Sequence, residues 1–219
     1  MDKVNKGSGG QSKLEALLER LRDFSTPELC DGAQRCIAMD WQIKPQVGKN
    51  KICGPAVTVD LPPGEGALAA DVILYLKKGD VLVIAGKGRC DCSYWGDHRS
   101  ICAAMMGAEA VVIDGAFRDA EGCEKTGFPV FAKGLTCRTA AKSGQGTIQS
   151  EVSCGGILVR SGDLIVGDRN GVVVIPPEDA EEIMERAESK RRLQELLIKQ
   201  MKKTGKVIPK ISEKYLLEN

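Results

Sequence analysis

The sequence has a single histidine, His98, and almost no excess charge of either sign. Its 31 Lys and Arg residues against 30 Asp and Glu residues give a formal net charge of +1, which argues against the concentrated basic face of a dedicated nucleic-acid-binding protein. No apolar run approaches the ~18 residues that a membrane span needs, and residues 1–10 lack the apolar segment of a signal peptide. We therefore expect a cytoplasmic protein that binds neither nucleic acid nor membranes.

Paired C-x-x-C spacing is also missing, although the chain contains nine cysteines. An odd number of cysteines in a chain long enough to build its own core predicts reduced thiols rather than a disulfide scaffold. The closest pair, Cys90 and Cys92, flanks Asp91 in a predicted loop. A structural zinc ion there would need two further ligands from elsewhere in the chain, so the role of this segment stays open.

The hydrophobic pattern predicts an α/β fold that ends in a long charged helix. Residues 1–10 are predicted to form a flexible tail, residues 11–203 a single α/β domain, and residues 204–219 a second tail. The predicted helices cover residues 12–22, 26–38, 66–76, 96–106, 120–126 and 177–203. The predicted strands cover residues 52–61, 81–85, 110–113, 128–132, 157–160, 164–167 and 172–175, with a loop over 86–95. Thr26 is the expected N-cap of the second helix, and Asn170-Gly171 predicts a hairpin.

The predicted helix over residues 177–203 is too long and too polar to pack only against its own domain. An incomplete apolar stripe runs along it, and such a stripe adds stability only where something covers it. We therefore expect a homo-oligomer in which this helix reaches a neighbouring subunit.

Chemically versatile residues follow two of the buried strands. Residues 81–85 lead to a helix start at Gly96-Asp97, and residues 110–113 lead to Asp114, Arg118 and Asp119. Ligands of open α/β sheets bind at the carboxyl ends of strands. A helix N-terminus attracts a carboxylate, an arginine offers a two-pronged donor, and an aspartate can hold Mg²⁺ or Mn²⁺ together with water.

Two less specific interpretations compete with this one. Gly86-Lys87-Gly88 follows a strand as in a dinucleotide-binding turn, but Asp91 stands where the third glycine is needed. Asp119 could simply cap the next helix while Arg118 pairs with a surface acid. Neither interpretation requires catalysis.

The order of several short motifs closely resembles the RraA-like family over about residues 25–200. This family contains the 4-hydroxy-4-methyl-2-oxoglutarate/4-carboxy-4-hydroxy-2-oxoadipate aldolases and the regulator of ribonuclease E activity. The motifs that carry the resemblance are Gly-Pro-Ala-Val-Thr-Val (54–59), Pro-Pro-Gly (62–64), Lys-Lys-Gly-Asp-Val-Leu-Val-Ile (77–84), Gly-Asp (96–97), Val-Val-Ile-Asp-Gly-Ala-Phe-Arg-Asp (111–119), Gly-Phe-Pro-Val-Phe-Ala-Lys-Gly (127–134) and Gly-Asp-Arg-Asn-Gly-Val-Val-Val-Ile-Pro (167–176).

The resemblance implies a β/β/α sandwich, with N-terminal helices and the long C-terminal helix, assembled as trimers or hexamers of trimers. It implies that a divalent metal, Mg²⁺ or Mn²⁺, is bound by Asp119, and that Asp97 helps to hold water beside it. Lys142 is implied to lie near the site, and Glu188 or Glu195 to enter a neighbouring subunit's site. The implied substrate-binding residues are Gly96, Asp97, His98, Arg99 and Arg118.

The expected function is a class II aldolase that cleaves a 4-hydroxy-2-oxo acid, such as 4-hydroxy-4-methyl-2-oxoglutarate, to pyruvate, with oxaloacetate decarboxylation as a side activity. The alternative is a protein-binding regulator of an endoribonuclease without catalysis. A binding protein does not need Arg118, Asp119 and Asp97 together, whereas the enzyme does. The stretch Arg89–Trp95 departs from the usual family loop, which leaves the physiological substrate open if this stretch lines the pocket.

Overall fold

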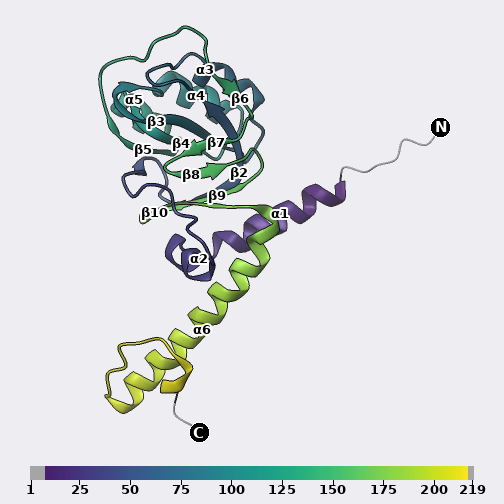
Figure 1. Ribbon diagram of the computed structural model, residues 1–219, viewed down its shortest axis with the longest axis vertical. Helices are drawn as coiled ribbons and strands as arrows, with labels where there is room; N and C mark the ends of the chain where they lie inside the picture. The colour runs from purple at the N-terminus through teal and green to yellow at the C-terminus, as the bar shows by residue number, and fades with distance from the viewer. Residues whose placement is uncertain (1–7, 217–219) are drawn as a thin grey trace, which may run out of the picture.

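The computed structural model describes residues 8–216 and shows a curled mixed sheet between two other layers (Figure 1). Helices cover one face of the sheet, a small hairpin covers the other, and a long C-terminal helix extends away from both. The expected α/β fold class is confirmed. No helix within residues 8–216 is long and apolar enough to cross a membrane.

Four parallel strands form the centre of the sheet, and their inner residues are almost continuously buried, as parallel sheets covered on both faces require. They are β2 (Ile52–Asp60), β3 (Val81–Ser93), β4 (Ala110–Phe117) and β5 (Val130–Leu135). Antiparallel strands extend the sheet in the order β1-β5-β4-β3-β2-β9-β10. They are β1 (Lys44–Val47), β9 (Leu164–Asp168) and β10 (Gly171–Ile175), with β6 (Thr147–Ile148) pairing with β2. The hairpin predicted at Asn170-Gly171 joins β9 to β10.

Each face of the sheet has its own hydrophobic core. On the helical face lie α3 (Leu68–Asp71), the 3₁₀ helix η1 (Val72–Tyr75), α4 (Asp97–Met105) and α5 (Ala120–Thr126). The hairpin of β7 (Val152–Cys154) and β8 (Ile157–Val159) packs on the opposite face. The two cores pack on opposite faces of the parallel strands. This packing fixes the positions of the strand ends and of the helix starts that follow them.

A third core joins the two ends of the chain. α1 (Ser8–Arg22) and α2 (Thr26–Gly32) pack against β9, β10 and the first turns of α6 (Ala180–Thr204). α6 follows the 3₁₀ turn η2 (Pro177–Asp179) and extends away from the sheet (Figure 1), and the chain then returns along it through η3 (Glu213–Tyr215). Leu196 on the extending part is 50% exposed, so the apolar stripe is only partly covered within one chain.

Several predicted helix boundaries are wrong. α2 ends at Gly32 rather than at residue 38, because Ala38 pairs with Val173 at the edge strand β10. Ser25, not Thr26, is the N-cap, and it forms a capping box with Glu28. The helix predicted over 66–76 is two short pieces, α3 and η1. α1 begins at Ser8, within the predicted tail, whereas residues 1–7 and 217–219 of the predicted tails lie outside the described residues.

The loop predicted over residues 86–95 is also wrong, since β3 continues to Ser93. Lys87 and Gly88 adopt left-handed backbone conformations, with φ of 57° and 73°, which bend the strand without ending it. The pairing register with β4 shifts on both sides of Arg89, as at a β-bulge. Glycines at 86 and 88 therefore mark a bent strand rather than a loop.

Candidate active site

A cavity of about 270 Å³ opens between the start of α4, the turn from β4 to α5 and the segment around Lys142. Seven of the site residues expected from the sequence line it: Gly96, Asp97, His98, Arg99, Arg118, Asp119 and Lys142. Ala70, Ser93, Trp95 and Thr139 complete the lining. Asp114 does not line it, because its carboxylate is buried on the other face of the sheet beside the Lys133 ammonium, 2.8 Å away.

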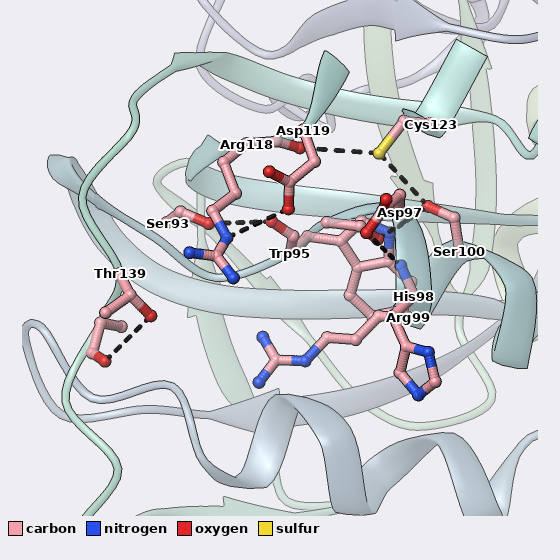
Figure 2. Close-up of polar contacts among 12 residues, drawn as sticks. Ser93, Trp95, Asp97, His98, Arg99, Ser100, Arg118, Asp119, Cys123 and Thr139 are labelled. Carbon is pink, nitrogen blue, oxygen red and sulfur yellow. Dashed lines mark hydrogen bonds and ion pairs between the residues drawn. The ribbon is translucent and has the colours of Figure 1, made fainter. Parts of the chain in front are cut away.

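The start of α4 is open towards this cavity. Gly96 is the N-cap residue and has no side chain to cap the helix, so the first-turn N–H groups depend on other partners. The Asp97 carboxylate accepts the N–H of His98 at 2.6 Å. The His98 imidazole points away from Arg118 and Asp119 (Figure 2) and lies 3.7 Å from the Cys102 thiol. The ring of His98 is therefore not directed at the two side chains that follow β4.

Arg118 and Asp119 follow directly after β4. The Arg118 N–H donates to the carbonyl of Trp95 at 3.1 Å, which joins the turn to the start of α4. Asp119 has a left-handed backbone, φ 57° and ψ 44°, and its side chain makes no capping hydrogen bond to α5. Its Oδ2 lies 3.1 Å from Arg118 Nε instead (Figure 2). Asp119 is thus the N-cap residue of α5 by position, but its side chain does not cap the helix. A non-glycine residue held in this conformation is a form of strain that clusters at functional sites.

Two glycines allow the carboxylates to pack closely. A Cβ atom at Gly96 would lie 2.8 Å from Asp119 Oδ2, and one at Gly122 would lie 2.6 Å from Asp97 Oδ2. Both distances are shorter than a van der Waals contact. The sequence motif indicated Gly96, whereas Gly122 stands in the middle of α5 without any signal of its role.

A buried hydrogen-bond network behind the cavity joins its two walls (Figure 2). The Trp95 indole donates to Ser100 Oγ at 2.9 Å, and Ser100 Oγ donates to the Gly96 carbonyl at 3.1 Å. The Cys123 thiol lies 3.6 Å from both Ser100 Oγ and the Arg118 carbonyl. These polar side chains fix the backbones of Gly96 and Arg118 relative to each other. Sequence reasoning missed Ser100 and Cys123, which belong to no recognisable spacing.

Arg99 lines the cavity but also supports its walls. Its guanidinium donates to the carbonyls of Tyr94 and Gly66, the latter at 3.0 Å. Burial, with the neighbouring Arg118 cation as a smaller cause, lowers the pKa of Arg99. Two of its donors are thus occupied by the protein, whereas Arg118 is held by one contact to Asp119 and by its backbone.

The central residues of the chain identify its family. Residues 26–174 match the model described as "RraA-like: Aldolase/RraA". The chain belongs to the RraA-like family. The matched range contains every residue that lines the cavity.

The relatives and structural neighbours of this chain carry names of several kinds. A Halalkalibacterium halodurans protein named "Putative 4-hydroxy-4-methyl-2-oxoglutarate aldolase" is 34% identical over 174 residues, covering 80% of this chain and 83% of that protein. A solved but uncharacterized Pseudomonas syringae protein has a TM-score of 0.77 at 28% identity, covering 87% of this chain and 90% of its own. The structure titled as the RNA-processing inhibitor RraA from Thermus thermophilis has a TM-score of 0.65 at 25% identity, covering 70% of this chain and 95% of its own.

The stretch that departs from the usual RraA-like loop contributes less to the cavity than its position suggested. Of residues 89–95, Ser93 and Trp95 line the cavity, and Arg89 pairs with Asp91 along β3. Cys90 is exposed, Cys92 is buried in the core, and both are free thiols.

Carboxylate oxygens are the metal ligands that this RraA-like cavity offers. Within residues 8–216 no group of three or more His, Cys, Asp or Glu side chains could hold a metal ion. Asp119 and Asp97 both line an open cavity with room for water. Mg²⁺ commonly keeps several waters and uses one or two protein carboxylates, so this donor set fits Mg²⁺ chemistry better than a closed zinc site, which needs four protein ligands.

Proposed function

We propose that this protein is a divalent-metal-dependent aldolase that cleaves a 4-hydroxy-2-oxo acid, such as 4-hydroxy-4-methyl-2-oxoglutarate, to pyruvate. The observation that carries the proposal is that Arg118, Asp119, Asp97 and the open start of α4 all line one cavity. Each supplies a separate requirement of such a reaction: an oxyanion donor, a metal ligand, a proton acceptor and a carboxylate-binding surface. The names of the aldolase relatives support the same substrate class.

The charge balance of the cavity favours an anionic substrate. Three cationic side chains line it, those of Arg99, Arg118 and Lys142, against the two carboxylates of Asp97 and Asp119. The excess of one positive charge grows further when a divalent cation is bound. A 2-oxo acid with two carboxylates, which includes 4-hydroxy-4-methyl-2-oxoglutarate and oxaloacetate, is complementary to this charge.

The chain's own residues account for binding and proton movement. The C1 carboxylate docks on the N–H groups at the start of α4, where the helix dipole is positive. The C4 hydroxyl proton leaves through a water to the Asp97 carboxylate. The freed O–H electron pair forms the C4 carbonyl as the C3–C4 bond breaks. The C3–C4 electron pair becomes the C2=C3 double bond, and the π pair of the C2 carbonyl moves to its oxygen to give the enolate. Arg118 donates to the enolate oxygen, and Lys142 adds a second positive charge that binds a carboxylate of the substrate. Protonation of the enolate at C3 gives pyruvate.

Asp119, with Asp97 nearby, is the residue we propose to hold the divalent cation, Mg²⁺ or Mn²⁺. When bound, the cation would supply the Lewis acid that the C2 keto oxygen needs. No Schiff-base lysine is then required. Oxaloacetate decarboxylation uses the same residues, because loss of CO₂ from oxaloacetate leaves the same pyruvate enolate.

The proposed assembly is a trimer or a hexamer of trimers. α6 extends away from the sheet (Figure 1), and its C-terminal turns contain Leu196 and Met201, of which Leu196 is half exposed. Neither Glu188 nor Glu195 lines the cavity of its own chain. A neighbouring subunit that covers this part of α6 would bring one of these glutamates near its own cavity.

The second candidate function is a protein-binding regulator, favoured by the structural similarity to the Thermus thermophilis RNA-processing inhibitor. One assay separates the two functions: pyruvate release from a panel of 4-hydroxy-2-oxo acids and oxaloacetate, with Mg²⁺ and with excess EDTA. We expect release with Mg²⁺ and its loss with EDTA. Release that persists in EDTA would overturn the metal-dependent reaction, and no release from any substrate would favour the regulator.

A further inference from the structure

Two segments far apart in the sequence run side by side next to the candidate active site. The Gly66 N–H donates to the carbonyl of Ala141 at 2.9 Å, and the Ala141 N–H donates to the carbonyl of Gly64 at 2.8 Å. Each segment is joined to a cation of the cavity. Lys142 follows Ala141 and lines the cavity itself, and the Gly66 carbonyl accepts from the Arg99 guanidinium at 3.0 Å.

The carboxylate of Glu65 connects these two segments. Its Oε1 accepts the N–H groups of Gly66 at 3.0 Å and Ala67 at 2.8 Å. Its Oε2 accepts both the N–H, at 2.8 Å, and the hydroxyl of Ser143. The side chain is buried, with 4% of the residue exposed, and it does not line the cavity. One carboxylate thus accepts hydrogen bonds from four donors, two in each of the paired segments.

We propose that Glu65 is a positioning residue that fixes Lys142 and Arg99 for binding the substrate's carboxylates. This inference rests on the proposed function, because it assigns those two cations to substrate. Ser143 is bonded to Lys142, so the contacts of Ser143 with Glu65 restrict where the Lys142 backbone lies. Gly66 supplies the carbonyl that holds Arg99. That carbonyl shares a planar peptide unit with the Ala67 N–H, so the contact of Glu65 with the Ala67 N–H restricts it.

The ionisation of Glu65 is consistent with this role. Hydrogen bonds, above all that from the Ser143 hydroxyl, lower its pKa to about 2, so the side chain is a carboxylate at neutral pH. An ionised carboxylate only accepts hydrogen bonds, which matches four surrounding donors. A glutamine at this position would direct an NH₂ group, which cannot accept hydrogen bonds, at the donors of one of the two segments.

The test compares Glu65→Gln with Glu151→Gln as a matched control. Glu151 has a half-exposed carboxylate that pairs with Arg160, and it does not line the cavity. Amide hydrogen exchange at Gly66, Ala67 and Ser143 should become faster in E65Q and stay unchanged in E151Q. With oxaloacetate and Mg²⁺, we expect KM of E65Q to rise about tenfold while kcat stays within roughly threefold, as for lost binding of substrate and transition state alike. Ser143→Ala, which removes one donor, should change both readouts in the same direction by less.

The two proposals fail in different ways. If the proposed function is wrong, the wild-type protein releases no pyruvate. If the inference about Glu65 is wrong, E65Q exchanges these amides like the wild type, or exchanges them faster with an unchanged KM. Should E65Q not fold, Ser143→Ala carries the test alone, and a wild-type KM together with wild-type exchange in that variant would overturn the inference.

Discussion

The Asp119 carboxylate packs directly against the backbone of Gly96, the N-cap residue of α4. A Cβ atom at position 96 would lie 2.8 Å from Asp119 Oδ2. The two residues come from different strand ends, so this contact joins the proposed metal ligand to the proposed carboxylate-binding helix start. The backbone of Gly96 is extended, with φ of −173°, and any residue adopts it. The missing side chain, rather than backbone freedom, is what the site requires.

Gly96→Ala should therefore displace Asp119 without unfolding the protein. A displacement of about 1 Å at a reacting centre costs on the order of 10²-fold in rate, and we expect a loss of that size in kcat/KM for pyruvate release. Gly134→Ala is the matched control, because a Cβ there would meet nothing within 4 Å. The melting temperatures of both variants should stay close to that of the wild type. Equal activity in G96A and G134A would contradict the role assigned to the Gly96–Asp119 contact.

Asp119→Asn tests the negative charge of this residue while leaving its backbone conformation in place. Asparagine tolerates the left-handed conformation as aspartate does, so stability should be maintained. The neutral amide is a much poorer ligand for a hard cation. Mn²⁺ affinity measured by calorimetry should therefore fall at least tenfold, since even residues that only orient a metal ligand change metal affinity by about 10- to 100-fold. Unchanged Mn²⁺ affinity would show that the cation binds elsewhere.

Arg118→Lys should lower kcat far more than it changes KM. Lysine keeps the charge but loses the planar pair of donors. We expect a loss on the order of 10²-fold, comparable to the removal of one oxyanion donor. Arg138→Lys, an exposed position outside the cavity, is the control in the same steady-state assay. An R118K variant within about threefold of wild-type kcat would assign Arg118 a purely structural role.

The lowered pKa of Glu65 predicts how stability depends on pH. Folding lowers this pKa from its ordinary value of 4.5 to about 2, so the unfolded chain binds the proton more tightly. The carboxylate therefore stabilises the folded state fully above about pH 4.5, and this contribution is lost as the pH falls towards 2. Urea unfolding should show E65Q to be less stable than the wild type at pH 7, with the difference narrowing between pH 4.5 and 2. A difference that is constant over this range would mean that the pKa of Glu65 is not lowered by folding.

Removing the extending part of α6 should affect assembly before it affects folding. Ile183, Met184 and Ala187 are buried in the third core, and the Arg191 guanidinium stacks on Phe24 at 4.7 Å. A chain that ends after Arg192 keeps these contacts but loses Glu195 and the exposed stripe. Light scattering should show a smaller assembly, and pyruvate release should fall because neighbouring cavities lose a contribution. A fully active monomer would refute the shared-site arrangement.

The sequence could predict the site residues that follow the buried strands of the sheet. Arg118 and Asp119 come directly after β4, which begins with a run of buried apolar residues, and Gly96-Asp97 precedes a helical pattern. The carboxyl ends of parallel strands meet at one edge, so such residues converge whatever their separation along the chain. Lys142 came from the family resemblance, and it lines the same cavity.

The remaining features depend on contacts that no local pattern encodes. Glu65 stands in a Pro- and Gly-rich turn. Two of its four hydrogen-bond donors belong to Gly66 and Ala67, and the other two belong to Ser143, which is distant in the sequence. The segment predicted as a loop over 86–95 is mostly a bent strand. It bends at Lys87, whose left-handed backbone cannot be predicted from the residue type. The helix predicted to continue to residue 38 stops at Gly32, because the chain beyond it completes the edge of the sheet.

The left-handed backbone of Asp119 has a consequence for which residues can occupy this position. Among non-glycine residues, asparagine, aspartate and histidine are enriched in this conformation. Of these, only aspartate also provides a short carboxylate for a hard cation. Saturation mutagenesis of codon 119 should then give two different outcomes. Selection for folded protein should recover several residues, with glycine and asparagine among them, and selection for pyruvate release should recover aspartate alone.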